Sequence, residues 1–336
     1  MSEKVLDIGD GITRIAVPTP FAVGRVNCYL IDDDPLTLVD TGPNSGTSLT
    51  ELEAGIAAAG FKVEDLERIV LTHQHIDHIG LASILAERSG AEIVALAALA
   101  PWLASYRESM DADDRFGEAV MLRNGVPQDL SLGLRAVSAS FRAWGAGAHV
   151  DRTVSDGETL EFGRRSWHVH HRPGHSPSDT VFLDERTGVL IGGDHLLDVI
   201  SSNPLITRPL DAEPGDEAAR KRPPALIIYL DSLARTRELD VAVVHGGHGD
   251  QIDDHRALID QRFEGHERRA GKIASLLAHG PANAFELAQR MWGNVAVTQA
   301  YLTLSEILGH LDILERDGRV ERVAGSDAVT FRVPTP

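Results

Sequence analysis

The sequence predicts an α/β protein that carries a helical insert and a separate C-terminal element. Several apolar strand patterns end in short loops that contain metal-ligand residue types, and functional groups on loops held by a sheet are typical of α/β enzymes. A stretch from about residue 99 to residue 145 has no strand character and is interpreted as an inserted helical cap. From about residue 263 the pattern changes to three helices and a short hairpin.

The N-terminal part of the chain alternates between strand and helix patterns. Its expected strands are residues 12–17, 26–31, 36–39, 66–71 and 91–97, and its expected helices are residues 47–59 and 79–88. The first of these helices should end near Gly60, because a glycine directly after a helix is a common C-cap.

Residues 73–78 read His-Gln-His-Ile-Asp-His and follow the strand pattern 66–71 directly. The simpler interpretation is that these residues lie close together by chance. Four potential metal ligands in six positions at a strand end nevertheless favour a metal site. His73 and His75 project to the same side of an extended backbone, while Asp77 and His78 lie where the chain turns into the next helix. One short segment can therefore supply ligands to two neighbouring ions. Zinc suits imidazole and carboxylate ligands, and iron or manganese could fill the same set.

Three later motifs have the same form, a strand pattern followed by a loop with one ligand type. They contain His175 after residues 166–171, Asp194 at the end of residues 190–194, and His248 in the glycine-rich end of residues 241–249. His195 should point away from Asp194 on strand alternation, so we expect a structural role for it. His245 is a weaker candidate for a group that faces the substrate.

These motifs resemble those of the metallo-β-lactamase-fold hydrolases, from about residue 10 to residue 260. The signature HxHxDH stands at residues 73–78, and Asp40 matches the family's aspartate after an early strand. The resemblance implies an αββα sandwich with two metal ions, and Asp40 orienting a ligand histidine. The implied ligands are His73, His75 and His175 for one ion, Asp77, His78 and His248 for the second, and Asp194 as the bridge between them.

The ligand identities exclude some branches of that family. The commonest zinc β-lactamases carry cysteine at the position of Asp194, and the single cysteine, Cys28, lies in a strand pattern as a small buried hydrophobe. Di-iron oxygen reductases carry glutamate where His75 stands. Glyoxalase II-like thioesterases, lactonases and nucleases remain. The segment 20–29 and the C-terminal element resemble the branch that includes β-lactamase-like protein 2.

The insert is rich in large apolar side chains. These are Trp102, Tyr106, Met110, Phe116, Met121, Phe141 and Trp144. One interpretation is that they only pack the insert against the core. The other is that some of them line a pocket over the metals that accepts an acyl group.

The C-terminal element resembles a winged-helix module, with helical patterns at residues 268–277, 284–292 and 297–314 and a hairpin at 320–323 and 329–333. We therefore expect a catalytic domain at residues 1–261 and a winged-helix-like domain at 262–336. From residue 262 onward, nine Lys and Arg balance nine Asp and Glu, so the element lacks the basic footprint of a DNA-binding module. We expect it to serve packing or the formation of a homodimer.

The formal net charge of −18 disfavours a polyanionic partner, because nucleic acid must be bound through Lys and Arg. The Arg164-Arg165 pair is short and is expected to be solvated surface. No segment has the length and apolarity of a membrane span or signal peptide, and one cysteine provides no disulfide framework. We expect a cytoplasmic protein that acts on a small molecule.

The resemblance implies metal-assisted hydrolysis. In that mechanism a hydroxide bridging two ions attacks a carbonyl carbon, and Asp77 and Asp194 hold the ions, with Asp77 as a candidate for moving the proton. The favoured substrate is a carboxylic ester or thioester. The alternatives are a single-strand endoribonuclease or other phosphodiesterase, a lactonase or β-lactamase, and a non-catalytic regulator that binds DNA through the winged helix.

Overall fold

The computed structural model describes residues 4–211, 221–323 and 328–334, and its chain divides into two compact units. The first, here called the sheet unit, comprises Met1–Met110, Phe141–Ser202 and Glu238–His255. The second, the helical unit, comprises Asp111–Ser140, Asn203–Arg237 and Arg256–Pro336. Each unit is assembled from three separate segments of the sequence.

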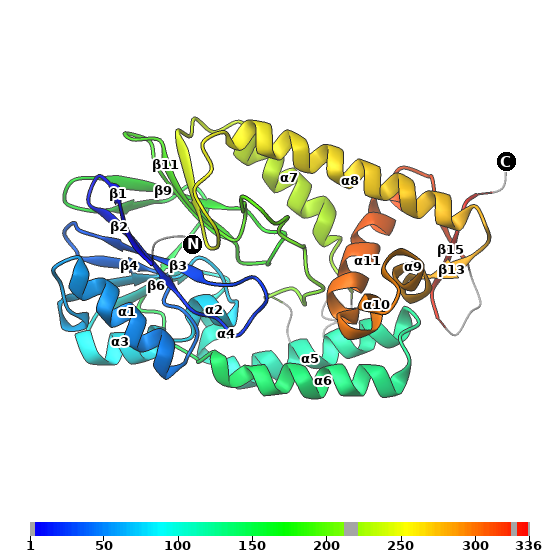
Figure 1. Ribbon diagram of the computed structural model, residues 1–336, viewed down its shortest axis with the longest axis horizontal. Helices are drawn as coiled ribbons and strands as arrows, with labels where there is room; N and C mark the ends of the chain where they lie inside the picture. The colour runs from blue at the N-terminus through cyan, green and yellow to red at the C-terminus, as the bar shows by residue number, and fades with distance from the viewer. Residues whose placement is uncertain (1–3, 212–220, 324–327, 335–336) are drawn as a thin grey trace. The chain divides into compact units, whose positions relative to one another are not determined.

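Two sheets form the centre of the sheet unit (Figure 1). The first sheet contains, in order, β1 (Val5–Gly9), β2 (Ile12–Val17), β3 (Val26–Ile31), β4 (Thr37–Val39), β5 (Arg68–Val70), β6 (Glu92–Leu96) and β7 (Arg152–Val154). The second runs in the order β12 (Val243–Gly246), β11 (Val189–Gly193), β10 (Thr180–Asp184), β9 (Ser166–His171) and β8 (Thr159–Glu161). The predicted strands are all present, and β2 and β3 begin and end at the predicted residues.

The core of the sheet unit lies between the two sheets. Val39, Val70 and Val94 of the first sheet contribute to the same buried cluster as Trp167 and Phe182 of the second. Helices α1 (Gly46–Ala58) and α3 (Ala82–Ser89) lie on the outer side of the first sheet (Figure 1). Two packed sheets with helices outside them confirm the predicted mixed α/β class, and α1 and α3 form one of the two outer helix layers that the predicted αββα sandwich requires.

The predicted helix 79–88 is present as α3, and its first residue, Ile79, ends a separate short helix, α2 (Ile76–Ile79). At Gly80, between the two helices, an added Cβ would lie 2.2 Å from the backbone nitrogen of Asn44 and 2.5 Å from the backbone oxygen of Trp144. Such close approach of other backbone segments leaves no room for a side chain. The helix is therefore confirmed, and its predicted start lies three residues before the observed one.

The insert is helical, as expected. It contains α4 (Ala100–Ala104), α5 (Tyr106–Arg123), α6 (Gln128–Phe141) and the short 3₁₀ helix η2 (Arg142–Trp144). Phe116 and Met121 of α5 are buried in the core of the helical unit. In the sheet unit, Trp102 and Tyr106 are buried with ring centroids 5.5 Å apart. These four side chains therefore have packing roles.

The helical unit also contains the C-terminal helices and a small sheet of order β13-β15-β14. The elements are α7 (Ala225–Arg237), α8 (His255–Leu277), β13 (Ala282–Asn283), α9 (Ala284–Trp292), α10 (Val295–Thr298), α11 (Ala300–Arg316), β14 (Glu321–Val323) and β15 (Thr330–Arg332). The expected hairpin is present as β14 and β15. The winged-helix assignment and the domain boundary at residue 261 remain predictions.

Helix α8 is longer than the predicted helix 268–277 and runs through residue 261. Its buried positions include Ile259, His266, Ala270, Ile273 and Leu277, which share one helical face. A histidine within this face interrupts the apolar pattern on which the prediction depended.

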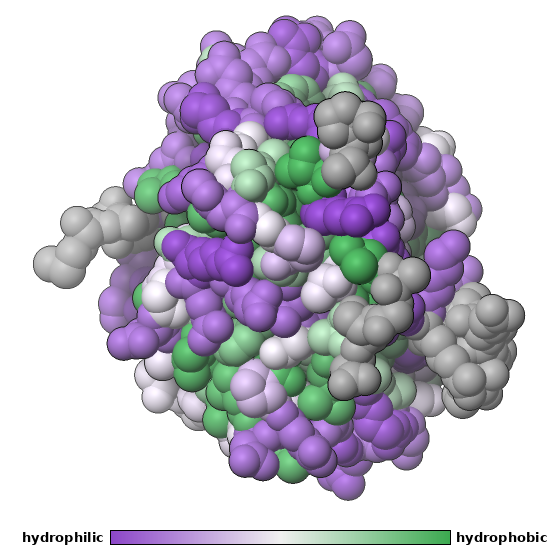
Figure 2. All heavy atoms as spheres, turned by 90° about the vertical axis from the view of Figure 1, so that its right-hand side faces the viewer, coloured by the Kyte–Doolittle hydropathy of each residue, from purple (hydrophilic) through white to green (hydrophobic). Residues whose placement is uncertain are grey.

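Among the residues that the structure describes, no helix has both the length and the apolarity needed to cross a bilayer. On the face shown in Figure 2, hydrophobic groups form several small patches separated by hydrophilic ones. Large contiguous apolar patches are the usual mark of a protein interface. The predicted homodimer thus gains no support from this face and remains a prediction.

Candidate metal centre

The candidate site lies at one edge of the sheet unit, where several strands end. β4 is parallel to β5, and β11 is parallel to β12, so their carboxyl ends meet at the same edge within each sheet. Asp40, His73, Asp194 and His248 follow the ends of these four strands. The topology explains how residues far apart in the sequence reach one place.

The first group of potential metal ligands consists of His73, His75, His175 and Asp194. One potential ligand atom from each of these side chains lies within 4.8 Å of all the others. Nδ1 of His75 lies 3.1 Å from Nε2 of His73 and 3.0 Å from Nε2 of His175. Nε2 of His175 is 3.6 Å from Oδ2 of Asp194. Three nitrogens and one oxygen thus surround a position that could hold one cation.

The second group consists of Asp77, His78 and His248. Here too, one potential ligand atom from each side chain lies within 4.8 Å of the others. Nε2 of His248 lies 3.4 Å from Oδ2 of Asp77 and 3.5 Å from Oδ2 of Asp194. Nε2 of His78 lies 3.4 Å from Oδ1 of Asp194. The Asp194 carboxylate therefore faces both groups, which is the position that the family resemblance implies for a bridging ligand.

Asp40 fixes the orientation of His78 directly and of His73 through Thr72, on the side of each ring that faces away from the centre. Its Oδ2 lies 2.7 Å from Nδ1 of His78 and accepts a hydrogen bond of 2.8 Å from the Thr72 hydroxyl, which in turn lies 2.9 Å from Nδ1 of His73. The backbone N–H of Thr72 donates to Oδ1 at 2.9 Å. Both rings are thereby fixed with Nε2 toward the centre, the usual arrangement of metal-ligating histidines.

His248 is oriented by the backbone. Its Nδ1 lies 2.8 Å from the carbonyl oxygen of Arg25, which accepts the hydrogen bond, so Nε2 faces Asp77 and Asp194. This contact joins the loop that carries His248 to the segment just before β3. Sequence reasoning had not assigned any role to Arg25.

A polar network joins the loop of His73 and His75 to the loop of His175, and sequence reasoning missed it. The backbone N–H of Gln74 donates to the Ser178 hydroxyl at 3.2 Å, and the Ser176 hydroxyl donates to Oε1 of Gln74 at 2.9 Å. Oδ2 of Asp179 accepts from the backbone N–H of Ser176 at 2.8 Å. The polar residues immediately after His175 were the available signal.

The centre has the features of a cavity shaped for a cation. A Cβ added at Gly247 would lie 2.2 Å from Oδ1 of Asp194 and 2.7 Å from Cε1 of His78, so only glycine fits there. Nε2 of His78 and Oδ1 of Asp194 are both buried, and neither makes a hydrogen bond. Buried polar atoms normally have partners, and a divalent ion would supply one. The residues therefore fit a metal site.

Burial and neighbouring imidazoles keep His73 and His75 neutral. Burial, and then the proximity of His78, lowers the pKa of His73 well below its usual value. Burial, and then His175, lowers the pKa of His75 to about 3. A neutral imidazole offers the lone pair that a metal requires.

The second group has the opposite electrostatic character. Burial alone would lower the pKa of His248, but Asp194 and Asp77 outweigh it and raise that pKa to about 10. Although burial alone raises the pKa of Asp194, His248 and His78 lower it well below the usual range. The carboxylates thus remain ionised, and they attract positive charge to the place where the second group meets Asp194.

The remaining histidines near these strands do not join either group. His245 is buried, its ring centroid lies 5.9 Å from that of Tyr29, and burial lowers its pKa to about 4. His195 is fully buried. Cys28 is a buried free thiol whose pKa is raised well above the usual value, chiefly by burial, as expected for a packing residue.

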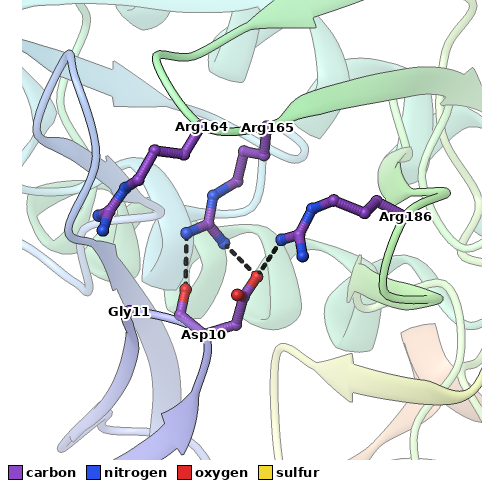
Figure 3. A pocket seen from close by; sticks show the side chains of 5 residues that line it. All are labelled: Asp10, Gly11, Arg164, Arg165 and Arg186. Atoms are coloured by element: carbon purple, nitrogen blue, oxygen red, sulfur yellow. Dashed lines mark hydrogen bonds and ion pairs between the residues drawn. The ribbon is translucent and has the colours of Figure 1, made fainter.

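A second polar feature of the sheet unit is a pocket of about 430 Å³, and its lining residues are Asp10, Gly11, Arg164, Arg165 and Arg186 (Figure 3). The Arg165 side chain is 2% exposed and pairs with Asp33 at 2.9 Å and Asp10 at 3.2 Å. Arg186 pairs with Asp10 at 2.6 Å. The expectation of solvated surface holds for Arg164, which is 62% exposed, and is wrong for Arg165. Because carboxylates already neutralise these arginines, the pocket is an ion-pair network and not a phosphate site.

Comparisons with known proteins agree with this geometry. The family model described as the metallo-beta-lactamase superfamily matches residues 22–248. The "Probable metallo-hydrolase YqjP" of Bacillus subtilis is 33% identical over 323 residues, which cover 96% of this chain and 98% of that protein. "Hydroxyacylglutathione hydrolase GloC" of Haemophilus influenzae is 25% identical over 181 residues, 53% of this chain and 69% of that protein.

A solved structure is similar over nearly the whole chain. The crystal structure of the metallo-beta-lactamase family protein TTHA1429 from Thermus thermophilus has a TM-score of 0.79 and 26% sequence identity, and the match covers 98% of this chain and 100% of that one. The family match spans more than half of the sequence and includes the whole histidine and aspartate cluster. The chain belongs to the metallo-beta-lactamase superfamily.

Proposed function

We propose that this protein is a metal-dependent hydrolase that cleaves a carboxylic ester or thioester, with zinc as the preferred ion. The observation that carries the proposal is the position of Asp194, whose carboxylate lies within 3.4–3.6 Å of histidine nitrogens from both groups. A carboxylate shared in this way is suited to two adjacent ions.

Two ions would be held by the two groups described above, and when bound they would polarise a substrate carbonyl and lower the pKa of bound water to about 7. Asp194 holds the two groups together and keeps the negative charge buried between them. Asp40 prevents the rings of His73 and His78 from rotating away, through Thr72 and directly.

We assign proton transfer to Asp77. Burial alone would raise its pKa, but the hydrogen bond from His248 and the charge of His78 lower it below the usual value. The side chain is 10% exposed, so it reaches the edge of the centre. An ionised carboxylate in that position can accept a proton from water and return it to a leaving thiolate or alkoxide.

The thioester assignment rests on chemistry and on one relative. The ligand set contains no cysteine, and GloC, which is named for the hydrolysis of an acylated glutathione, matches 53% of this chain. The net charge of −18 disfavours a nucleic-acid substrate.

The test is thiol release from a panel of glutathione and coenzyme A thioesters by zinc-reconstituted protein, with chelated protein as a control. We expect metal-dependent turnover of at least one thioester, and loss of that turnover in Asp77→Asn. His149→Ala is the matched control, because His149 lies in the same unit with an 86% exposed side chain. It should leave turnover unchanged.

If protein shown to hold two ions releases no thiol from any thioester in the panel, the thioester assignment is contradicted. Lactones would be tested next, and then single-stranded RNA. Cleavage of RNA that falls steeply with added salt would identify a phosphodiesterase, because phosphate contacts are salt-sensitive.

A further inference from the structure

The helical unit contains a second histidine cluster, between α8 and α11. His266 of α8 and His310 of α11 are 3% and 0% exposed. Nδ1 of His266 lies 3.2 Å from Nε2 of His310. Glu306 lies one helical turn before His310, and one potential ligand atom from each of the three residues lies within 4.8 Å of the others.

The orientation of His310 is that of a ligand. Its Nδ1 donates to the backbone oxygen of Glu306 at 2.7 Å, so the lone pair on Nε2 points toward His266. Metal-ligating histidines usually donate their other ring N–H in this way. In a tetrahedral zinc site with bonds of about 2.05 Å, two ligand nitrogens lie about 3.3 Å apart. The observed separation of 3.2 Å matches that spacing.

Glu306 brings a carboxylate to the cluster, within the same 4.8 Å limit as the two histidines. Its side chain is 12% exposed and is ion-paired with Arg269. In this ion-paired position, Oε1 lies 3.7 Å from Nδ1 of His310, the ring nitrogen that does not face His266. A hydrogen bond between two neutral imidazoles would also explain the contact between the rings, but it does not require a carboxylate beside them. Burial lowers the pKa of His266 to about 3 and also lowers that of His310, so both rings are in the form that binds metal.

We propose that His266, Glu306 and His310 form a separate site for a divalent transition metal, with zinc as the expected ion, which ties α8 to α11. The site belongs to the helical unit and shares no residue with the metal centre. The proposal is independent of the hydrolytic function.

The test uses a full-length background variant in which His75→Ala, His78→Ala and Asp194→Ala remove ligands from both groups of the metal centre. The metal-free variant is titrated with Co²⁺, whose visible absorption reports coordination by nitrogen and oxygen, and bound metal is counted by elemental analysis. We expect one equivalent of Co²⁺ per chain. Adding His266→Ala or His310→Ala should abolish this uptake, whereas His279→Ala should preserve it, since His279 is an exposed histidine just after α8.

The Arg269→Gln variant distinguishes the loss of a metal site from a loss of Co²⁺ uptake that is caused by misfolding. The substitution releases the Glu306 carboxylate from its ion pair, so Co²⁺ should bind about five- to tenfold more tightly. A folding defect cannot produce such a gain. Absence of Co²⁺ uptake by the background variant, or uptake that is the same in His310→Ala and unaffected by Arg269→Gln, would overturn the proposal.

Discussion

The metal centre and the cluster at His266 and His310 are both groups of buried histidines, but different kinds of structure build them. The metal centre is assembled from loops and a short helix that follow strand ends, and it collects seven potential ligand residues. The second cluster is built on the facing sides of two long helices and collects three. Loops bring many side chains to one point, whereas a pair of helices offers only the few that lie on the facing turns.

The two clusters also differ in how their rings are supported. In the metal centre, His73, His78 and His248 are each held at Nδ1 by a hydroxyl, carboxylate or backbone oxygen. In the second cluster His310 is held in this way, while Nε2 of His266 is buried without a hydrogen-bond partner. Contacts of this kind keep the rings of a functional site in a fixed geometry.

The largest expected effect is the loss of metal and activity together in Asp194→Ala. Removing the carboxylate that faces both groups should lower turnover more than about a thousandfold, since metal ions supply several kcal/mol of transition-state stabilisation. The measurement is the metal content and the initial rate of the same preparation. His310→Ala should keep the turnover of the intact protein, and an active, metal-replete Asp194→Ala would remove the assignment of the centre.

A smaller loss is expected from Asp40→Asn, which keeps the size of the side chain. Asp40 has a positive φ of 56°, and asparagine tolerates that conformation. The amide has a single acceptor oxygen, so it cannot accept both at Oδ2, from His78 and the Thr72 hydroxyl, and at Oδ1, from the Thr72 backbone N–H. The affinity for Zn²⁺ should therefore fall about 10- to 100-fold. Competition with a chelator measures this affinity. An unchanged affinity would show that Asp40 supports the fold only.

Acid should destabilise the metal-free protein through the second cluster. An unfolded imidazole has a pKa of about 6.5, whereas the folded-state pKa of His266 is about 3. Below pH 6.5 the unfolded chain therefore binds protons that the folded chain does not. The stability is fully present above pH 6.5 and is lost as the pH falls, by roughly 2 kcal/mol at pH 5 for His266 alone.

Urea unfolding of the original protein and His266→Gln, at pH 7 and pH 5, measures this contribution. The variant should lose less stability between the two pH values. Equal losses in the two proteins would mean that His266 is protonated as readily in the folded state as in the unfolded one.

The smallest effect is expected from Ser178→Ala. The hydroxyl accepts a hydrogen bond from the backbone N–H of Gln74, and losing one such contact typically costs about 1 kcal/mol. Turnover should therefore fall less than about tenfold, with metal content retained. Loss of metal in this variant would show that the link between the two ligand loops is as important as a ligand itself.

Much of the fold was predictable where the signal is local. The strands β2 and β3 were predicted at their observed bounds, because continuous apolar runs between turn residues are typical of buried strands. The start of α8 was not predicted, because His266 replaces an apolar residue on its buried face. The need for glycine at residue 80 depends on backbone that approaches Gly80 from elsewhere in the chain.

The sequence was sufficient to select the seven histidines and aspartates that the structure brings together, because four of them lie in residues 73–78 and each of the others follows a strand pattern. Their role as metal ligands remains a prediction. Tertiary structure alone decided which nitrogen of each ring faces the centre, and that Arg165 is a buried ion-pair partner. It also decided that His266 and His310, 44 residues apart, would touch. Such contacts depend on how helices and loops pack over long distances, and no local periodicity encodes them.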